Sequence, residues 1–272
     1  STQAKTLFPY TTLFRSQMPL AGLSIGKRSA LLLDKENMTK YSISPMSSLY
    51  ELYLRHPRIS TDSRRIEPDS VFFALRGASF DGNRFAAEAL DKGAAYAVVD
   101  DPAAVTDERM VLVGDTLGAL QELAREHRRR LAIPILAISG SNGKTTTKEL
   151  VSRVLAERFE VYATRGNLNN HIGVPKTLLR LTAENDIAVI EMGANHPGEI
   201  KTLVNIVEPD YGIITNVGKA HLKGFGSFEG VIRTKGELYD FMRENRFASA
   251  TNNAPVQPER TVFIDNDNPH LN

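Results

Sequence analysis

The segment that most constrains the fold of this chain is residues 135–155. A short apolar run, 135–138, leads directly into SGSNGKTTT, and an amphipathic stretch follows it. Glycines in such a turn let successive backbone N–H groups converge on phosphate oxygens, and the N-terminus of the next helix adds a positive field. This order predicts a phosphate-binding loop between a strand and a helix of an α/β domain. The predicted nucleotide-binding residues are Gly140, Ser141, Asn142, Gly143, Lys144, Thr145 and Thr146, and the predicted buried side of the helix is Leu150, Val151, Val154 and Leu155.

One position departs from the general motif GxxxxGK[ST]. Its first glycine would stand where this chain has Ile138, and the nearest glycine upstream of the Gly-Lys-Thr run is Gly140. The strand before the loop and the helix after it nevertheless favour nucleotide binding over a chance Gly-Lys-Thr. We expect Lys144 to contact the β and γ phosphates of a nucleotide and the Thr145 hydroxyl to complete the shell of a Mg²⁺ ion.

Polar residues also follow apolar runs further along the chain. The run 186–190 leads into Glu191, and a carboxylate at the C-terminal end of a neighbouring parallel strand points into the crevice where ligands bind. Glu191 is therefore a candidate magnesium ligand, with an ordinary strand-end charge as the alternative. His221 follows another predicted strand, 211–217, and on spacing alone it is equally a metal ligand or a surface residue.

Lys235 and two amide-rich loops have no clear role from residue types alone. Lys235 stands near the start of a predicted helix, 235–243. The loops 166–171 and 193–196 are rich in Asn and Gly, which usually make turns. Side-chain amides on the crevice side would equally suit a polar, peptide-like substrate.

The chain before the loop predicts a separate small α/β domain, residues 38–131. Expected strands at 71–75, 96–99 and 110–113 alternate with expected helices at 47–54, 85–93 and from 116 onward. Leu117, Leu120 and Leu123 share one face of the last helix. We expect its terminal Arg128-Arg129-Arg130 to be a solvated helix end rather than an anion site.

The second domain is expected to span 132–272, after a short joint at 131–134. A strand is predicted at 261–264, a turn at 266–269 and a polar loop at 246–259. Residues 1–37 show no sustained period and lack the order of a signal peptide. Because TLFPYTTLFRS resembles translated vector or adapter sequence, we expect this segment to be non-native or disordered and Met38 to be a natural start; a native extension is the alternative.

Composition excludes several classes of protein. The sequence has no Cys, so disulfides, thiolate catalysis and a Cys-ligated zinc site are ruled out. A net charge of +1 provides no argument for nucleic acid as a partner. The longest apolar run, 131–138, is far shorter than the ~20 residues that span a bilayer. We therefore expect a cytoplasmic protein that is not inserted in a membrane. We also expect a monomer, although composition gives no argument for the oligomeric state.

Five separated motifs in the second domain resemble those of the Mur ligases. They are SGSNGKTTTKEL, GNLNNHIGVPKTLL, EMGANHPGEI, NVGKAHLKGFGSFEGV and TKGELY. Upstream, STDSRRIEPDSVFFALRGASFDGNRF resembles the N-terminal UDP-sugar domain of the same family, so the resemblance covers about residues 40–272. Within the family, GANHPGEI favours the ligases that add D-alanyl-D-alanine.

The resemblance implies an ATP-dependent amide ligase of peptidoglycan precursor synthesis, hence of cell wall biogenesis, cell shape and division. Its substrates would be UDP-N-acetylmuramoyl-tripeptide and D-alanyl-D-alanine, joined through an acyl phosphate, and its fold a small UDP-substrate domain followed by a P-loop central domain with a mostly parallel sheet. By position, the resemblance assigns catalysis to Lys144, Glu191, His221 and Lys235, magnesium to Thr145, Glu191, His221 and carbamylated Lys235, peptide and phosphate contacts to Asn169 and Asn170, and uridine-side contacts to Ser63 and Arg64.

The family also has a third, C-terminal domain, which closes over ATP. We expect that domain to be absent here, with the chain ending inside or just after the central domain. Two alternatives stay open: a ligase that adds the third residue of the peptide, and a nucleotide-binding module without turnover, which we expect of the chain as given.

Overall fold

The computed structural model describes residues 45–218, 222–245, 259–265, 267–268 and 271. These residues belong to one compact unit, Ile43–Asn272. The predicted non-native segment 1–37, most of the predicted loop 246–259 and His221 lie outside the described residues. Within the described part, no helix is long and apolar enough to cross a membrane.

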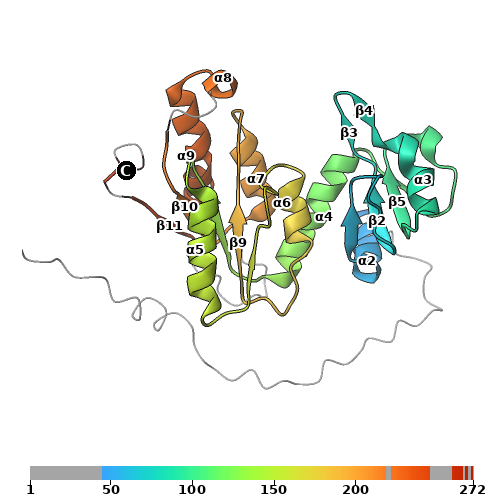
Figure 1. Ribbon diagram of the computed structural model, residues 1–272, viewed down its shortest axis with the longest axis horizontal. Coiled ribbons are helices and arrows are strands. Elements are labelled where there is room, and N and C mark those ends of the chain that lie inside the picture. The colour runs from blue at the N-terminus through green and yellow to red at the C-terminus, as the bar shows by residue number, and fades with distance from the viewer. Residues whose placement is uncertain (1–44, 219–221, 246–258, 266, 269–270, 272) are drawn as a thin grey trace, which may run out of the picture. The chain divides into compact units, whose positions relative to one another are not determined.

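The N-terminal part is a four-stranded parallel sheet in the order β1-β2-β5-β6 (Figure 1). Both faces of this sheet are covered, because Val71 and Phe73 of β2 belong to one buried cluster and Phe72 belongs to another. This explains why the predicted strand was apolar at every position. The strands are β1 (Arg58–Ser60), β2 (Ser70–Phe73), β5 (Tyr96–Val99) and β6 (Met110–Leu112), with a hairpin of β3 (Arg76–Gly77) and β4 (Phe80–Asp81). The helices are α2 (Pro45–Arg55), α3 (Ala86–Asp91) and α4 (Thr116–Leu131), with 3₁₀ turns at Gly82–Phe85 and Pro102–Ala104.

The central part is a five-stranded parallel sheet in the order β11-β10-β7-β9-β8. Helix α5 packs on one face of it, and α6, α7 and α9 contribute to the buried cluster on the other. Together the two sheets confirm the predicted α/β class. The strands are β7 (Ile135–Ser139), β8 (Val161–Ala163), β9 (Ile187–Glu191), β10 (Tyr211–Ile214) and β11 (Thr261–Phe263). The helices are α5 (Lys144–Ala156), α6 (Gly173–Leu178), α7 (Glu199–Val207), α8 (Leu222–Phe225) and α9 (Phe228–Glu244).

Of the four residues predicted on the buried side of α5, two are packed and two are exposed. Val151 and Leu155 pack against the sheet, but Leu150 and Val154 are 61% and 71% exposed. The buried stripe instead runs through Lys148, Val151 and Leu155, which are three and four residues apart and so share one side of a helix. Lys148 is buried because its Nζ donates a hydrogen bond to the Thr164 carbonyl at 2.7 Å. The buried side of α5 therefore includes a polar residue and differs from the side that its apolar residues suggest.

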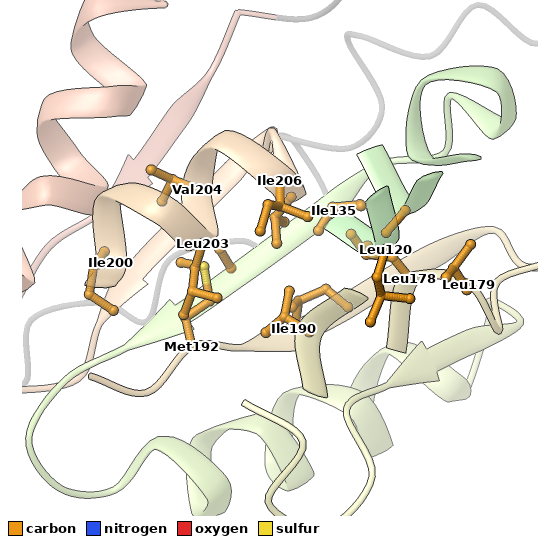
Figure 2. Close-up of a cluster of buried hydrophobic side chains, with 14 of the residues drawn as sticks. Leu120, Ile135, Leu178, Leu179, Ile190, Met192, Ile200, Leu203, Val204 and Ile206 are labelled. Atoms are coloured by element: carbon orange, nitrogen blue, oxygen red, sulfur yellow. The ribbon is translucent and has the colours of Figure 1, made fainter. Parts of the chain in front are cut away.

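Helix α4 packs against elements of both sheets. It contacts α2 and β2 of the N-terminal part and α6 and α7 of the central part. Leu120, which the sequence placed on its buried face together with Leu123, lies in the same apolar cluster as Leu178 and Leu203 (Figure 2). The apolar face of this helix is thus shared between the two sheets.

The end of α4 corrects the prediction of a solvated basic run. Arg129 and Arg130 are exposed and pair with Glu208 and Glu126, as a solvated helix end would. Arg128, however, is buried, and its guanidinium lies 2.7 Å from a carboxylate oxygen of Asp210. Its remaining hydrogen bonds go to the carbonyl oxygens of Val207, Ile133 and Glu208. This arginine therefore fastens α4 to the start of the central sheet.

Candidate active site

The candidate site lies where β7, β9 and β10 end at their carboxyl side. The parallel register sets Ile138 beside Glu191 and Ser139 beside Ile214, so the segments that follow the three strands meet at one edge. Open α/β sheets bind ligands at this edge. A cavity of about 620 Å³ opens there. It is lined by Leu117, Gln121, Gly140, Ser141, Lys144, Asn167, Asn169, Asn170, His171, Gly193, Ala194, Asn195, Glu199, Thr202, Leu203, Phe225 and Lys235.

The loop between β7 and α5 has the backbone that a phosphate cradle requires. Gly140 has φ +135° and Gly143 has φ +78°, a region that residues with a Cβ rarely adopt. Gly143 is also the N-cap of α5, so Lys144 and the following amides form its first turn. Amides in the first turn of a helix have no intrahelical acceptor and point outward from its end. The loop therefore leaves backbone donors without intrahelical partners at the start of α5, next to Lys144, which lines the cavity.

Replacing Gly140 by alanine is expected to distort this loop. A Cβ at position 140 would lie 2.1 Å from Oγ1 of Thr215, and the φ of +135° adds backbone strain. We expect a loss of about 1–3 kcal/mol in the free energy of unfolding, together with weaker ADP binding, measured by urea denaturation and by calorimetric titration. Gly143→Ala is the comparison, because its Cβ would meet nothing within 4 Å and only the strain of φ would act. Equal effects of the two substitutions would contradict the close-contact argument.

Lys144 is held at the loop itself. Its Nζ donates hydrogen bonds to the carbonyl oxygens of Gly140 at 2.9 Å and Ser141 at 3.2 Å. Burial lowers the pKa of Lys144 below its ordinary value, and the carboxylate of Glu191 offsets part of that shift. The ammonium group is thus partly desolvated, which strengthens its attraction for an anion in the cavity.

Glu191 is buried beside this loop and is bracketed by two polar side chains. Its Oε2 accepts a hydrogen bond from the Thr145 hydroxyl at 3.0 Å, and its Oε1 accepts one from the Asn169 amide at 2.8 Å. Oxygen donors of this kind suit Mg²⁺. Among the described residues no cluster of three or more His, Asp or Glu is arranged to hold a metal. The third predicted protein ligand, His221, lies outside them.

Lys235 does not stand near the start of a helix, as its neighbours in the sequence suggest. Helix α9 begins at Phe228, earlier than predicted, because the Ser227 hydroxyl caps it by accepting a hydrogen bond from Gly230 N at 3.1 Å. Lys235 consequently lies inside the helix, only 2% exposed, with Nζ 3.4 Å from the Ala194 carbonyl. Burial, reinforced by the charge of Lys144, lowers the pKa of Lys235 to about 8. A much larger fraction of its amine is therefore neutral and nucleophilic near pH 7 than in an exposed lysine.

The two amide-rich loops line the same cavity. They contact each other directly, since Gly193 N donates to the Asn169 carbonyl at 2.8 Å. Asn170 also makes a turn: its Oδ1 accepts hydrogen bonds from the backbone of Gly173 at 2.8 Å and Ile172 at 3.2 Å, at the start of α6. The sequence left turn formation and a position on the crevice side as alternatives for these loops. Asn170 both makes a turn and lines the cavity.

Ser63 and Arg64 are not among the residues that line this cavity. Ser63 lies in the loop after β1, and its carbonyl accepts a hydrogen bond from Lys92 Nζ at 2.9 Å. Arg64 is exposed and forms an ion pair with Asp62, with 2.8 Å between Nη2 and Oδ2. The structure therefore separates the predicted uridine-side residues from the phosphate loop.

Several residues of the site could not be found from the sequence. Gln121 comes from α4 and donates its amide hydrogen to the His171 carbonyl at 3.0 Å, but nothing in the helical pattern distinguishes it. Glu237 of α9 accepts hydrogen bonds from Gly198 N at 2.9 Å and Lys201 N at 2.7 Å, and so fixes the start of α7. For Thr215 and Asn216 a signal existed, because they are polar residues directly after an apolar run.

A glycine loop with Gly-Lys-Thr at the carboxyl edge of a parallel sheet defines a nucleotide-binding α/β protein of the P-loop class. Two family models match the chain: "Mur ligase family, catalytic domain" over residues 57–133 and "Mur ligase middle domain" over residues 138–268. The chain belongs to the Mur ligase family.

Two curated relatives of the chain carry the same name. The UDP-N-acetylmuramoyl-tripeptide–D-alanyl-D-alanine ligase of Escherichia coli K12 is 43% identical over 197 residues, which are 72% of this chain and 43% of the relative. The ligase of the same name from Synechocystis is 42% identical over 217 residues, 79% of this chain and 45% of the relative. The chain thus spans less than half the length of these relatives.

Solved structures agree with this assignment. A crystal structure of MurF from Acinetobacter baumannii has a TM-score of 0.64 and 42% identity, over 68% of this chain and 41% of that one. MurF ligase from Thermotoga maritima in complex with ADP also has a TM-score of 0.64, at 36% identity, over 69% of this chain and 44% of that one.

Proposed function

We propose that this chain provides the nucleotide-binding and UDP-substrate parts of a ligase that joins D-alanyl-D-alanine to UDP-N-acetylmuramoyl-tripeptide. The observation that carries the proposal is the shared cavity. Lys144 of the phosphate loop, Lys235 of α9 and both amide-rich loops line it together. Relatives named for this reaction, and a solved relative that holds ADP, support the same reading.

The reaction we propose proceeds through an acyl phosphate. The terminal carboxylate of the tripeptide attacks the γ-phosphorus of ATP, and the bond from that phosphorus to the bridging oxygen breaks to release ADP. The amine of D-alanyl-D-alanine then attacks the acyl carbon, loses a proton, and expels inorganic phosphate. Phosphoryl transfer of this kind depends on positioning and on neutralising charge. In the proposed reaction, Lys144 and the first amides of α5 do both.

The oxygen atoms of the Thr145 hydroxyl and the Glu191 carboxylate are donors that suit a divalent metal ion. Mg²⁺, when bound, withdraws charge from the phosphate oxygens, and we assign it to Thr145, Glu191 and His221. The pairing of the Thr145 hydroxyl with the Glu191 carboxylate, and of that carboxylate with Asn169, supports this assignment. Asn169 and Asn170 are assigned to the peptide and phosphate, and Ser63 and Arg64 to the uridine side of an N-terminal domain, 38–131, that precedes the central domain, 132–272.

Lys235 is assigned a different part. Its neutral amine would add to CO₂ and lose a proton, which converts a buried cation into a carbamate anion. A carbamate has oxygen donors for a second Mg²⁺ where an ammonium has none. Its burial and its lowered pKa support the assignment.

Carbamylation of Lys235 is expected to give a carbamate carbonyl resonance when the protein is incubated with ¹³C-bicarbonate. The resonance should disappear in Lys235→Arg, because a guanidinium does not add CO₂ under these conditions, and should remain in Lys201→Arg, an exposed lysine of α7. A carbamate resonance that persists in Lys235→Arg would contradict carbamylation of Lys235.

The substrate itself is tested by binding and by a partial reaction. We expect UDP-N-acetylmuramoyl-tripeptide to bind at least about 10-fold more tightly than the dipeptide form, since a site built to hydrogen-bond a group loses affinity without it. In a full-length ligase that contains this chain, ATP, Mg²⁺ and hydroxylamine should convert the tripeptide substrate to a hydroxamate, which traps the acyl phosphate without the amine acceptor. The chain as given should bind the substrate without this turnover. Tighter binding of the dipeptide form would favour a ligase that adds the third residue.

A further inference from the structure

The end of β10 is fastened to the phosphate loop by two residues. Asn216 accepts two hydrogen bonds from the loop: its backbone carbonyl from Ser141 N at 3.0 Å, and its side-chain Oδ1 from Asn142 N at 2.9 Å. The Thr215 hydroxyl lies 2.6 Å from the Asn142 carbonyl and 3.2 Å from the Ser139 carbonyl. These contacts join the loop to residues directly after β10, which lie 73 or more positions further along the chain.

These contacts divide the amides of the loop into two groups. Ser141 N and Asn142 N are already engaged by Asn216, so neither is the donor that a phosphate would use first. The donors left for phosphate begin at Gly143 and continue into the first turn of α5, beside Lys144. The backbone amides available to a phosphate therefore lie at the α5 end of the loop rather than at the β7 end.

This arrangement also accounts for the departure from GxxxxGK[ST]. Position 138 is inside β7 and paired with β9 and β10, so a glycine there would serve no turn. The sharp bend comes at Gly140, where a Cβ would collide with the Thr215 hydroxyl at 2.1 Å. In this chain the conformation of the loop is held by Thr215 and Asn216 after β10, and not by a glycine at position 138.

We propose that Asn216 is a positioning residue of the nucleotide site, which holds the phosphate loop open for the β-phosphate through the hydrogen bond to Asn142 N. Thr215 supports the same conformation through the Asn142 carbonyl. The inference rests on the nucleotide site of the proposed function and adds to it the residue that keeps the loop in its binding conformation.

The test is Asn216→Ala, which removes Oδ1 but keeps the backbone carbonyl. Hydrogen exchange followed by NMR should then lose protection at the Asn142 amide while the Ser141 amide keeps it. ADP binding should weaken by about 5- to 10-fold, the effect of one lost hydrogen bond. AMP, which lacks the β-phosphate, should change by less than about twofold. A general loss of structure would affect both amides and both nucleotides alike.

A second variant and a control complete the design. Thr215→Val removes the hydroxyl at similar volume and should lower ADP affinity in the same direction, which keeps the test available if Asn216→Ala does not fold. Asn205→Ala is the control, since its amide bonds the Lys201 carbonyl on α7, away from the loop. Unchanged ADP affinity in both loop variants, or equal losses for ADP and AMP, would overturn the proposal. Failure of the unmodified protein to bind ADP would instead overturn the proposed nucleotide site, and this inference with it.

Discussion

Replacement of Lys144 by alanine is expected to weaken ADP and ATP binding by about 10- to 100-fold, the usual effect of losing a hydrogen bond to a charged group. The reason is the partly desolvated position of Nζ at the loop, where its charge is poorly screened. Calorimetric titration of the purified chain with each nucleotide measures the change. ATP should lose more than ADP, because in the proposed function the lysine contacts the γ-phosphate as well.

Two controls separate this effect from a general loss of charge or structure. Lys201→Ala removes an equal charge from the exposed surface of α7 and should leave both affinities within about twofold of the unmodified protein, because solvent screens exposed charges. Lys144→Arg should also bind poorly, since a planar guanidinium does not replace a compact ammonium in a tight cradle. Unchanged nucleotide affinity in Lys144→Ala would remove the phosphate-loop assignment.

The largest expected effect on stability comes from Arg128→Ala. Loss of the guanidinium leaves Asp210 buried without its cation, although Asp210 Oδ2 still accepts a hydrogen bond from Ile135 N at 2.8 Å. Three backbone carbonyls also lose their donor. We expect the free energy of unfolding to fall by about 3–5 kcal/mol. Thermal denaturation should show a decrease in Tm on the order of 10 °C.

Arg129→Ala is the matched control one residue away. Its guanidinium pairs with Glu208 at the surface, so its removal should cost no more than about 1 kcal/mol. A double variant, Arg128→Met with Asp210→Leu, should recover most of the loss, because an apolar pair leaves no buried charge unpaired. Similar Tm values for Arg128→Ala and Arg129→Ala would contradict the stabilising role of the buried Arg128–Asp210 ion pair.

The parts of the site that could be read from the sequence are those specified by neighbours in the chain. Strand, loop, Gly-Lys-Thr and helix follow one another within residues 135–155, and the structure has β7, the loop and α5 there. The predicted strand 96–99 has the bounds of β5, because a short apolar run between turn residues decides both its ends. Glu191 could be placed at a strand end for the same reason.

The parts that could not be read depend on partners distant in sequence. Arg128 looks identical to Arg129 and Arg130 until the turn before β10 brings Asp210 beside it. The sequence predicts that Leu150 and Val154 are buried, whereas in the structure Lys148 lies on the inner side of α5 and donates to the Thr164 carbonyl. Lys235 looked like a lysine at a helix start until the loop before α7 was packed over it.

The sequence by itself determined that this chain contains a parallel α/β domain with a glycine loop between a strand and a helix, the loop to which we assign the phosphates. It could do so because backbone conformation and strand-to-helix order are local properties. Only the tertiary structure decided which charges are buried, how the amide-rich loops and α4 share one cavity, and that Asn216 holds the phosphate loop. These depend on register between strands far apart in the chain. Burial, and with it pKa and the strength of every charge in the site, is a property of that packing.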